Sequence, residues 1–118
     1  MEFGHVGKPF LSYTQRTRHA ELGHPLHAES GYVRIAEGRA EWTIAQPTGI
    51  VEVLEGAFDG LCLDVASSLV GLTATAKRVL ATRRRYEVVG DRLVYDVWMA
   101  HADQHVTHHL HAELEREA

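Results

Sequence analysis

Histidines are the residues of this sequence whose type and spacing suggest chemistry. The chain has nine of them, and five lie in residues 101–118, namely His101, His105, His108, His109 and His111. Neutral imidazole is a good ligand for zinc and for iron, and a haem protein needs only one such ligand because the porphyrin supplies four. The carboxyl-terminal segment is therefore a candidate metal or haem site, with a solvated polar strand as the alternative.

The secondary structure of this segment decides which histidines share a face. On a strand, alternation places His105, His109 and His111 on one face and His108 on the other, with the apolar residues. On a helix, His101, His105 and His108 would share a face, but the β-branched residues at 106–107 disfavour a helix. A zinc site is a weaker expectation than a haem site. Lone cysteine chemistry is also disfavoured, because Cys62 lies in an apolar run typical of a small buried residue.

Length and charge limit the classes of function expected for this protein. The chain has 118 residues, 45% of them hydrophobic, which predicts one globular domain over 1–118. The net charge of −4 argues against nucleic-acid binding. No apolar run approaches the roughly 20 residues of a membrane span, and the amino terminus lacks the order of a secretory signal. With a single cysteine, these features predict a cytoplasmic protein.

Apolar residues recur at spacing two in short runs, which is the rhythm of strands. Leu61, Leu63, Val65 and Leu69 share one parity, and a second such set is Leu93, Tyr95, Val97 and Met99. The other predicted strands are residues 10–18, 27–36, 39–45, 50–54, 69–76, 79–89 and 106–114. Turn residues at 37–38, 47–49 and 90–91 separate several of them, and 86–95 has the pattern of a hairpin.

Short connections favour antiparallel neighbours, so the fold class predicted is all-β, an antiparallel up-and-down β-barrel. Such a barrel encloses side chains or one small ligand. Strand 10–18 has no cleanly apolar face, which fits either a lumen partly lined by hydroxyls or an ordinary strand. The arginines at 83–85 are expected on a solvated exterior, and Trp42 and Trp98 in barrel packing.

Several segments, read in order, resemble the nitrobindin family of haem-binding β-barrels, which are built like fatty-acid-binding proteins and are also described as peroxynitrite isomerases. The matching segments are residues 5–11 (HVGKPFL), 13–17 (YTQRT), 25–32 (PLHAESGY), 47–49 (PTG), 73–77 (TATAK) and 109–110 (HL). The resemblance implies haem b, one per chain, bound through the histidine that precedes a leucine in the last strand. That residue is His109, and His108 is the alternative if the strand carries a bulge or the pocket takes the apolar parity.

The resemblance also implies an activity. Ferric haem would isomerise peroxynitrite to nitrate and bind nitric oxide, with no catalytic side chain beyond the haem iron. Lys77, in the family's Thr-Ala-Lys segment, would lie near the haem or pair with a propionate. The alternatives are a non-catalytic carrier of haem or another lipophilic ligand, and a degenerate copy that binds neither.

This chain departs from the family pattern at its start. The family's Gly-x-Trp-x-Gly-x-Gly and Tyr-Pro-Thr segments have no counterpart before residue 1, so about eight to nine strands are expected. An unpaired barrel edge would then favour a homodimer. Haem affinity would depend on whether the remaining strands hold the cofactor without the missing threonine contact.

Overall fold

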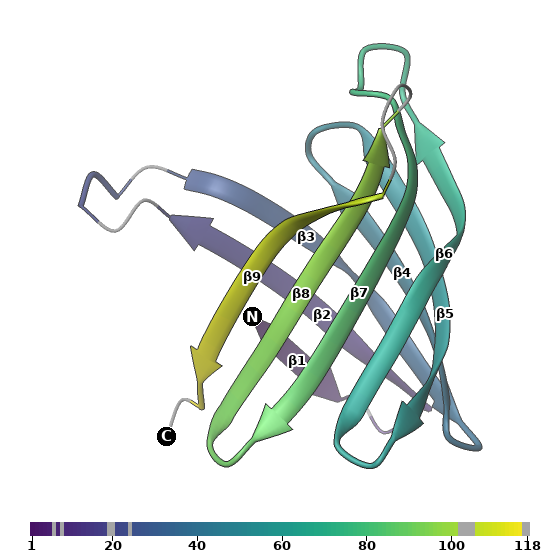
Figure 1. Cartoon of the computed structure of the whole chain (residues 1–118), viewed down its shortest axis with the longest axis vertical. Coiled ribbons are helices and arrows are strands. Elements are labelled where there is room, and N and C mark those ends of the chain that lie inside the picture. Colours follow the sequence, from purple (N-terminus) through teal and green to yellow (C-terminus); the bar gives the residue numbers. More distant parts are fainter. Residues whose placement is uncertain (6, 8, 19–20, 24, 102–105, 117–118) are drawn as a thin grey trace.

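The computed structural model describes residues 1–118 except 6, 8, 19–20, 24, 102–105 and 117–118. Within these residues, strands joined in chain order form one antiparallel sheet of nine that curls into a half-barrel (Figure 1). The strands are β1 (Glu2–His5), β2 (Phe10–Arg18), β3 (Pro25–Ala36), β4 (Arg39–Gln46), β5 (Ile50–Asp59), β6 (Cys62–Leu72), β7 (Val79–Val89), β8 (Arg92–His101) and β9 (Thr107–Glu115). The all-β class and the antiparallel order are confirmed.

Turn chemistry explains most strand boundaries. Glu37 and Gly38 both have positive φ, 54° and 77°, and join β3 to β4 in a two-residue turn whose twist matches that of the strands. Gly90, with φ of 60°, does the same between Val89 and Arg92, so the predicted hairpin is confirmed. Strands β2 and β7 begin and end where the sequence predicts.

The predicted strands differ from the structure at three places. The strand predicted over residues 50–54 continues to Asp59. The strand predicted over residues 69–76 ends at Leu72, because Ala76 donates to the carbonyl of Thr73 at 3.1 Å in a turn before β7. Strand β1 was not predicted, and it pairs with β2 from Glu2 opposite Thr14 to His5 opposite Leu11. No backbone pairing joins β1 to β9 among the described residues, so both outer strands of the sheet have a free edge.

The inner face of the half-barrel carries the core. Trp42 is at its centre, with the rings of Tyr13 and Tyr86 at centroid distances of 4.7 and 5.0 Å. Each fully buried side chain of this size contributes about 1.5–3 kcal/mol by leaving water. The other buried apolar residues of this core are Val33, Ala40, Ile44, Leu54, Leu63, Val65, Tyr95 and Val97. Trp98, in contrast, lies on the outer face, where the Arg83 guanidinium sits 5.3 Å from its ring centroid.

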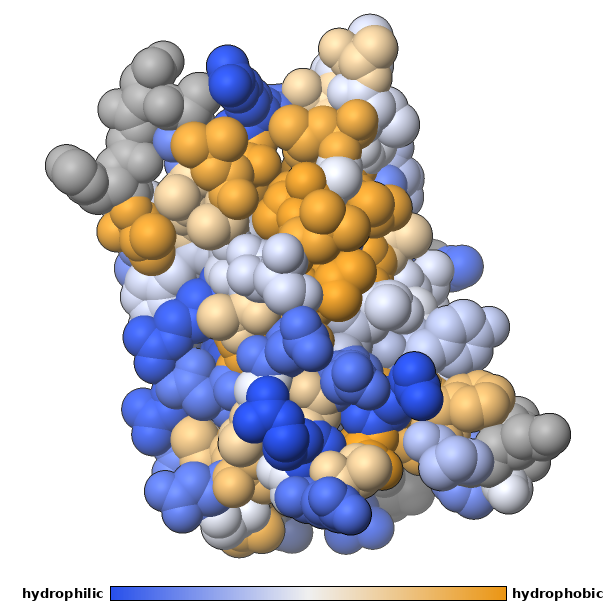
Figure 2. All heavy atoms as spheres, turned by 90° about the vertical axis from the view of Figure 1, so that its right-hand side faces the viewer, coloured by the Kyte–Doolittle hydropathy of each residue, from blue (hydrophilic) through white to orange (hydrophobic). Residues whose placement is uncertain are grey.

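A bulge in β6 overturns the parity predicted for Leu69. Ser67 pairs with Leu54 and Leu69 pairs with Val53, which leaves Ser68 as an extra residue. Leu63 and Val65 are buried as predicted, but beyond the bulge Leu69 points outward and is 58% exposed. Figure 2 views the molecule from the side of β5 and β6, and it shows apolar surface gathered there. Where the structure describes the chain, it contains no helix suited to cross a membrane.

Candidate functional site

A second bulge, in β9, separates the two adjacent histidines of the carboxyl-terminal strand. His108 pairs with Trp98 and Leu110 pairs with Val97, so His109 is an extra residue without a cross-strand partner. A bulge bends the strand and redirects the side chains on either side of it. Strict alternation therefore fails at this point, and the helical alternative for this segment is wrong because β9 is a strand.

The outer face holds His108 and His111. Their rings share one carboxylate oxygen of Asp96, with His108 Nε2 at 2.9 Å and His111 Nδ1 at 2.7 Å. The ring of His108 also packs edge-on against Trp98, at a centroid distance of 5.6 Å. Asp96 lies between the buried residues Tyr95 and Val97 of β8, so it points away from the lumen. The apolar parity predicted for His108 is thus wrong.

His109 differs from its neighbours in having a free imidazole. Among the described residues, neither ring nitrogen has a hydrogen-bond partner. Burial is the largest cause that lowers the pKa of His109 below its ordinary value of 6.5, and nearby basic groups add to it. Those groups, in order of effect, are His101, His27, His108 and Lys77. At neutral pH the ring is therefore uncharged, with a lone pair available for a ligand or metal.

These groups come together at one end of the half-barrel, which we call the mouth and define by His27, Lys77, His101 and His109. Lys77 is exposed in the turn between β6 and β7. Its predicted role near the haem or a propionate stays a prediction, and its charge is the last of the influences named for His109. His105 lies outside the described residues. Among the residues described, no group of three His, Cys, Asp or Glu side chains is arranged to hold a metal ion by itself.

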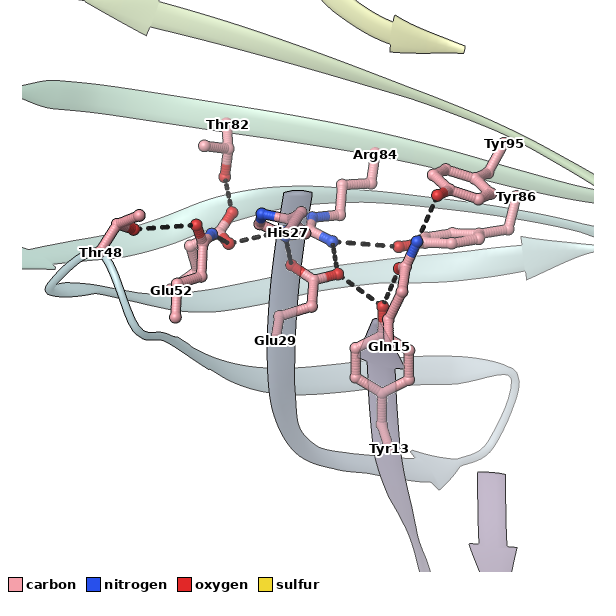
Figure 3. Close-up of polar contacts among 11 residues, drawn as sticks. Tyr13, Gln15, His27, Glu29, Thr48, Glu52, Thr82, Arg84, Tyr86 and Tyr95 are labelled. Carbon is pink, nitrogen blue, oxygen red and sulfur yellow. Dashed lines mark hydrogen bonds and ion pairs between the residues drawn. The ribbon is translucent and has the colours of Figure 1, made fainter. Parts of the chain in front are cut away.

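Behind the mouth lies a buried ionic cluster centred on Arg84 (Figure 3). The two terminal nitrogens of Arg84 donate to the two oxygens of Glu29, at 2.7 and 3.0 Å. One of these nitrogens, Nη2, also donates to Glu52 at 2.6 Å. The Arg84 side chain is only 3% exposed, so the expectation that arginines 83–85 all lie on the exterior is wrong for this one. Arg83 and Arg85 do lie outside, beside Asp64 and Cys62.

Hydroxyl and amide groups complete the cluster. Tyr13 donates to Glu29 at 2.5 Å, and Thr82 donates to Glu52 at 2.6 Å. Gln46 also donates to Glu52, at 2.8 Å. Burial is the main cause that raises the pKa of Tyr86 to about 12, so this ring stays neutral beside Arg84. Polar groups thus occupy the middle of the lumen.

Tyr13 and Gln15 explain why strand β2 has no cleanly apolar face. Both point inward and are buried, and the amide of Gln15 donates to the hydroxyl of Tyr95. The lumen is partly lined by hydroxyls, as one of the two sequence interpretations expects. Cys62, expected to be buried, is half-buried on the outer face, where its sulfur accepts from Arg85 Nε at 3.2 Å.

Sequence reasoning missed His27, Glu29 and Arg84, although the pattern contained a signal. In β7 the odd positions 83, 85 and 87 are all charged, whereas Arg84 shares its parity with Thr82 and Tyr86. That alternation places Arg84 inside and calls for a buried carboxylate opposite.

A curled antiparallel sheet with a filled polar lumen and a free imidazole at its mouth defines a small ligand-binding β-barrel. Comparison with protein families makes the class specific, because the model described as "THAP4-like, heme-binding beta-barrel domain" matches residues 1–116. The chain belongs to this family of haem-binding β-barrels.

Similar proteins agree with this assignment. The chain is 43% identical to "Peroxynitrite isomerase 1" of Rhodococcus jostii, over 99% of this chain and 67% of that protein. It is 44% identical to "Peroxynitrite isomerase" of Nocardia farcinica, over 99% of this chain and 73% of that protein. The crystal structure of Rv2717c from M. tuberculosis superposes with a TM-score of 0.92 at 41% identity, covering 98% of this chain and 77% of that one.

Proposed function

We propose that this protein binds one haem b at the mouth through His109 and acts as a peroxynitrite isomerase that also binds nitric oxide. The observation that carries the proposal is the free, uncharged imidazole of His109, in a chain 43% identical to a protein named peroxynitrite isomerase. Haem, when bound, supplies a Lewis-acidic ferric iron able to isomerise peroxynitrite to nitrate and an iron centre for nitric oxide.

The residues at the mouth fit this cofactor. His109 offers a nitrogen lone pair that no described side chain occupies, whereas His108 and His111 are engaged with Asp96. Lys77, exposed in the turn between β6 and β7, puts a positive charge at the mouth, which suits the negative propionates of haem. The buried cluster of Glu29, Glu52 and Arg84 fills the lumen behind the mouth, so a flat ligand held by His109 stays near the opening.

A non-catalytic carrier of haem or of another lipophilic ligand is the second candidate. It is favoured by an apolar pocket of about 220 Å³ at the end of the half-barrel away from the mouth. The side chains lining it include Phe3, Leu11, Trp42, Leu63 and Leu93. A ligand held there would contact no group that promotes a reaction.

Haemin titration tests the proposal. The wild type and His108→Gln are expected to give the same Soret band with one haem per chain, and His109→Gln is expected to lose it. Stopped-flow decay of peroxynitrite, compared with free haemin at equal concentration, then separates isomerase from carrier. Equal Soret bands in wild type and His109→Gln would contradict the proposed ligand.

Two further proposals concern the state of the protein. The free edges of β1 and β9 support a homodimer formed by strand pairing, which sedimentation equilibrium would detect. A cytoplasmic location is supported by the single cysteine of the chain, and fractionation of cells would test it.

A further inference from the structure

The apolar pocket at the end of the half-barrel away from the mouth has a buried floor and an open rim. Buried side chains form the floor, among them Val33, Trp42 and Leu63. Side chains exposed to solvent form the rim, and these are Phe3, Ile35, Phe58, Leu61 and Val88. A small molecule can therefore enter from solvent and reach the core without passing the mouth.

The lining decides the charge of a ligand that fits this pocket. None of the described residues that line it carries a charge, and only Trp42 and Tyr86 have a polar atom in the side chain. The hydroxyl of Tyr86 points into the ionic cluster, where it accepts from Arg84 Nη1 at 3.3 Å (Figure 3). A charged ligand would lose its hydration here without gaining a counter-ion, so the pocket selects an uncharged ligand.

Trp42 brings a hydrogen-bond donor without a partner to the same lining. Its side chain is 1% exposed, and its Nε1 is buried with no hydrogen-bond partner among the described residues. Buried N–H groups almost always have a partner, and a buried donor left without one costs free energy. A ligand that presents an acceptor to the indole would recover this cost.

The volume of the pocket limits the size of the ligand. An apolar cavity of about 150 Å³ holds one benzene molecule, and sites for drug-sized ligands measure roughly 300–1,000 Å³. The pocket measures about 220 Å³, so it accommodates one ring with a short substituent.

We propose that this pocket is a second binding site, which takes an uncharged, ring-sized molecule and donates a hydrogen bond from Trp42 Nε1 to its single acceptor. The proposal goes beyond haem binding, and it names a ligand class for the carrier function that is the second candidate. Because the cluster of Glu29, Glu52 and Arg84 fills the middle of the lumen, haem at the mouth and a ligand in this pocket can be bound at the same time.

The two indole groups of the chain make the site testable by ¹H–¹⁵N NMR. The probes are acetophenone, ethylbenzene as its counterpart without an acceptor, and benzoate as its charged counterpart. Acetophenone is expected to move the Trp42 Nε1–H signal downfield, the direction of hydrogen-bond formation, whereas ethylbenzene should bind without that downfield shift. Benzoate should leave the signal unchanged. Trp98, on the outer face, is the internal control and should not respond to any probe.

Variants separate the donor from the pocket. Trp42→Phe keeps an aromatic ring without the donor, so the ratio of acetophenone to ethylbenzene affinity, measured by calorimetry, should fall about fivefold, the size of one net hydrogen bond. Val88→Phe leaves Trp42 in place and enlarges a side chain of the rim. It should weaken both neutral probes by roughly tenfold, the effect of about two methylene groups displaced from the pocket. Val89→Phe, on the opposite face of β7, is the matched control and should bind as wild type.

Three results would overturn the proposal. They are a Trp42 signal that ignores both neutral probes, an affinity ratio unchanged in Trp42→Phe, and a Trp42 shift that follows protein concentration instead of probe, which would place a second copy of the chain in the pocket. The Soret band scores haem binding independently. A normal Soret band without probe binding contradicts this inference alone, and probe binding by a protein that takes up no haemin contradicts the haem proposal alone.

Discussion

Arg84 binds Glu29 through both of its terminal guanidinium nitrogens, at 2.7 and 3.0 Å, inside the lumen of the half-barrel. This bidentate pair links β7 to β3, strands that are not neighbours in the sheet. A second carboxylate, Glu52 on β5, shares the same guanidinium at 2.6 Å. The cluster therefore joins three strands across the interior, and its integrity depends on a single cation.

Removal of that cation should be strongly destabilising. Arg84→Met leaves two buried carboxylates without their partner, and we expect the free energy of unfolding to fall by about 3–5 kcal/mol. Urea denaturation followed by tryptophan fluorescence measures the change. Arg83→Met is the matched control on the outer face, with an expected cost within about 1 kcal/mol. Equal urea midpoints for the two variants would refute the proposed importance of the cluster.

Glu29 should make the free energy of unfolding depend on pH in the acid range. Its pKa in the folded protein is about 2, below the ordinary value of 4.5, so the folded state binds fewer protons than the unfolded state between these values. Its contribution is fully present above about pH 4.5 and is lost as the pH falls towards 2. Unfolding free energies measured from pH 2 to 6 should show this slope. Glu29→Gln should flatten it, whereas Glu55→Gln, at an exposed site on β5, should leave it intact.

We expect the protein to retain haem at mildly acidic pH. Since the pKa of His109 is lowered below 6.5, its imidazole remains unprotonated at a pH where an ordinary histidine is half-charged. The Soret band should therefore reach half its intensity below pH 6.5. His101→Gln removes a positive neighbour of His109 and should shift this midpoint to higher pH. A midpoint unchanged in that variant would show that the two rings are not coupled.

Two glycines in the sheet should differ in their tolerance of alanine. A Cβ at Gly56 would lie 1.8 Å from the backbone oxygen of Asp64, which cannot move without breaking the β5–β6 pairing. We expect Gly56→Ala to lower the free energy of unfolding by about 1–3 kcal/mol. At Gly71 a Cβ would meet a methyl group of the exposed Val51 side chain, which can turn away. Thermal unfolding should show a clearly smaller loss for Gly71→Ala, and equal losses would contradict this account.

The strand order and most boundaries could be predicted because turn residues mark them locally. Bulges could not, since an extra residue such as Ser68 is recognised only against the partner strand that skips it. The same holds for β9, where alternation placed His108 with the apolar residues. Only the pairing of Trp98 with His108 and of Val97 with Leu110 shows the reversal.

The buried cluster escaped prediction for a different reason. The charge of Arg84 favours the exterior and only its parity favours the interior. Its carboxylate partners lie 55 and 32 residues away in the sequence. No residue close to 83–85 in the sequence indicates which carboxylates these are. The choice of His109 as a ligand came from resemblance rather than from alternation, and it stays a prediction until haem binding is measured.

The ionic cluster also divides the molecule by how readily its parts can open. Residues of β2, β3, β5, β7 and β8 are tied to one another by buried side-chain bonds, so these strands should exchange their amide hydrogens only when the whole domain unfolds. Strand β9 is held by β8 alone among the described strands and contributes nothing to that cluster. The strand that carries His109 should therefore open while the remainder stays folded, and its amide hydrogens should exchange faster than those of the strands tied to the cluster.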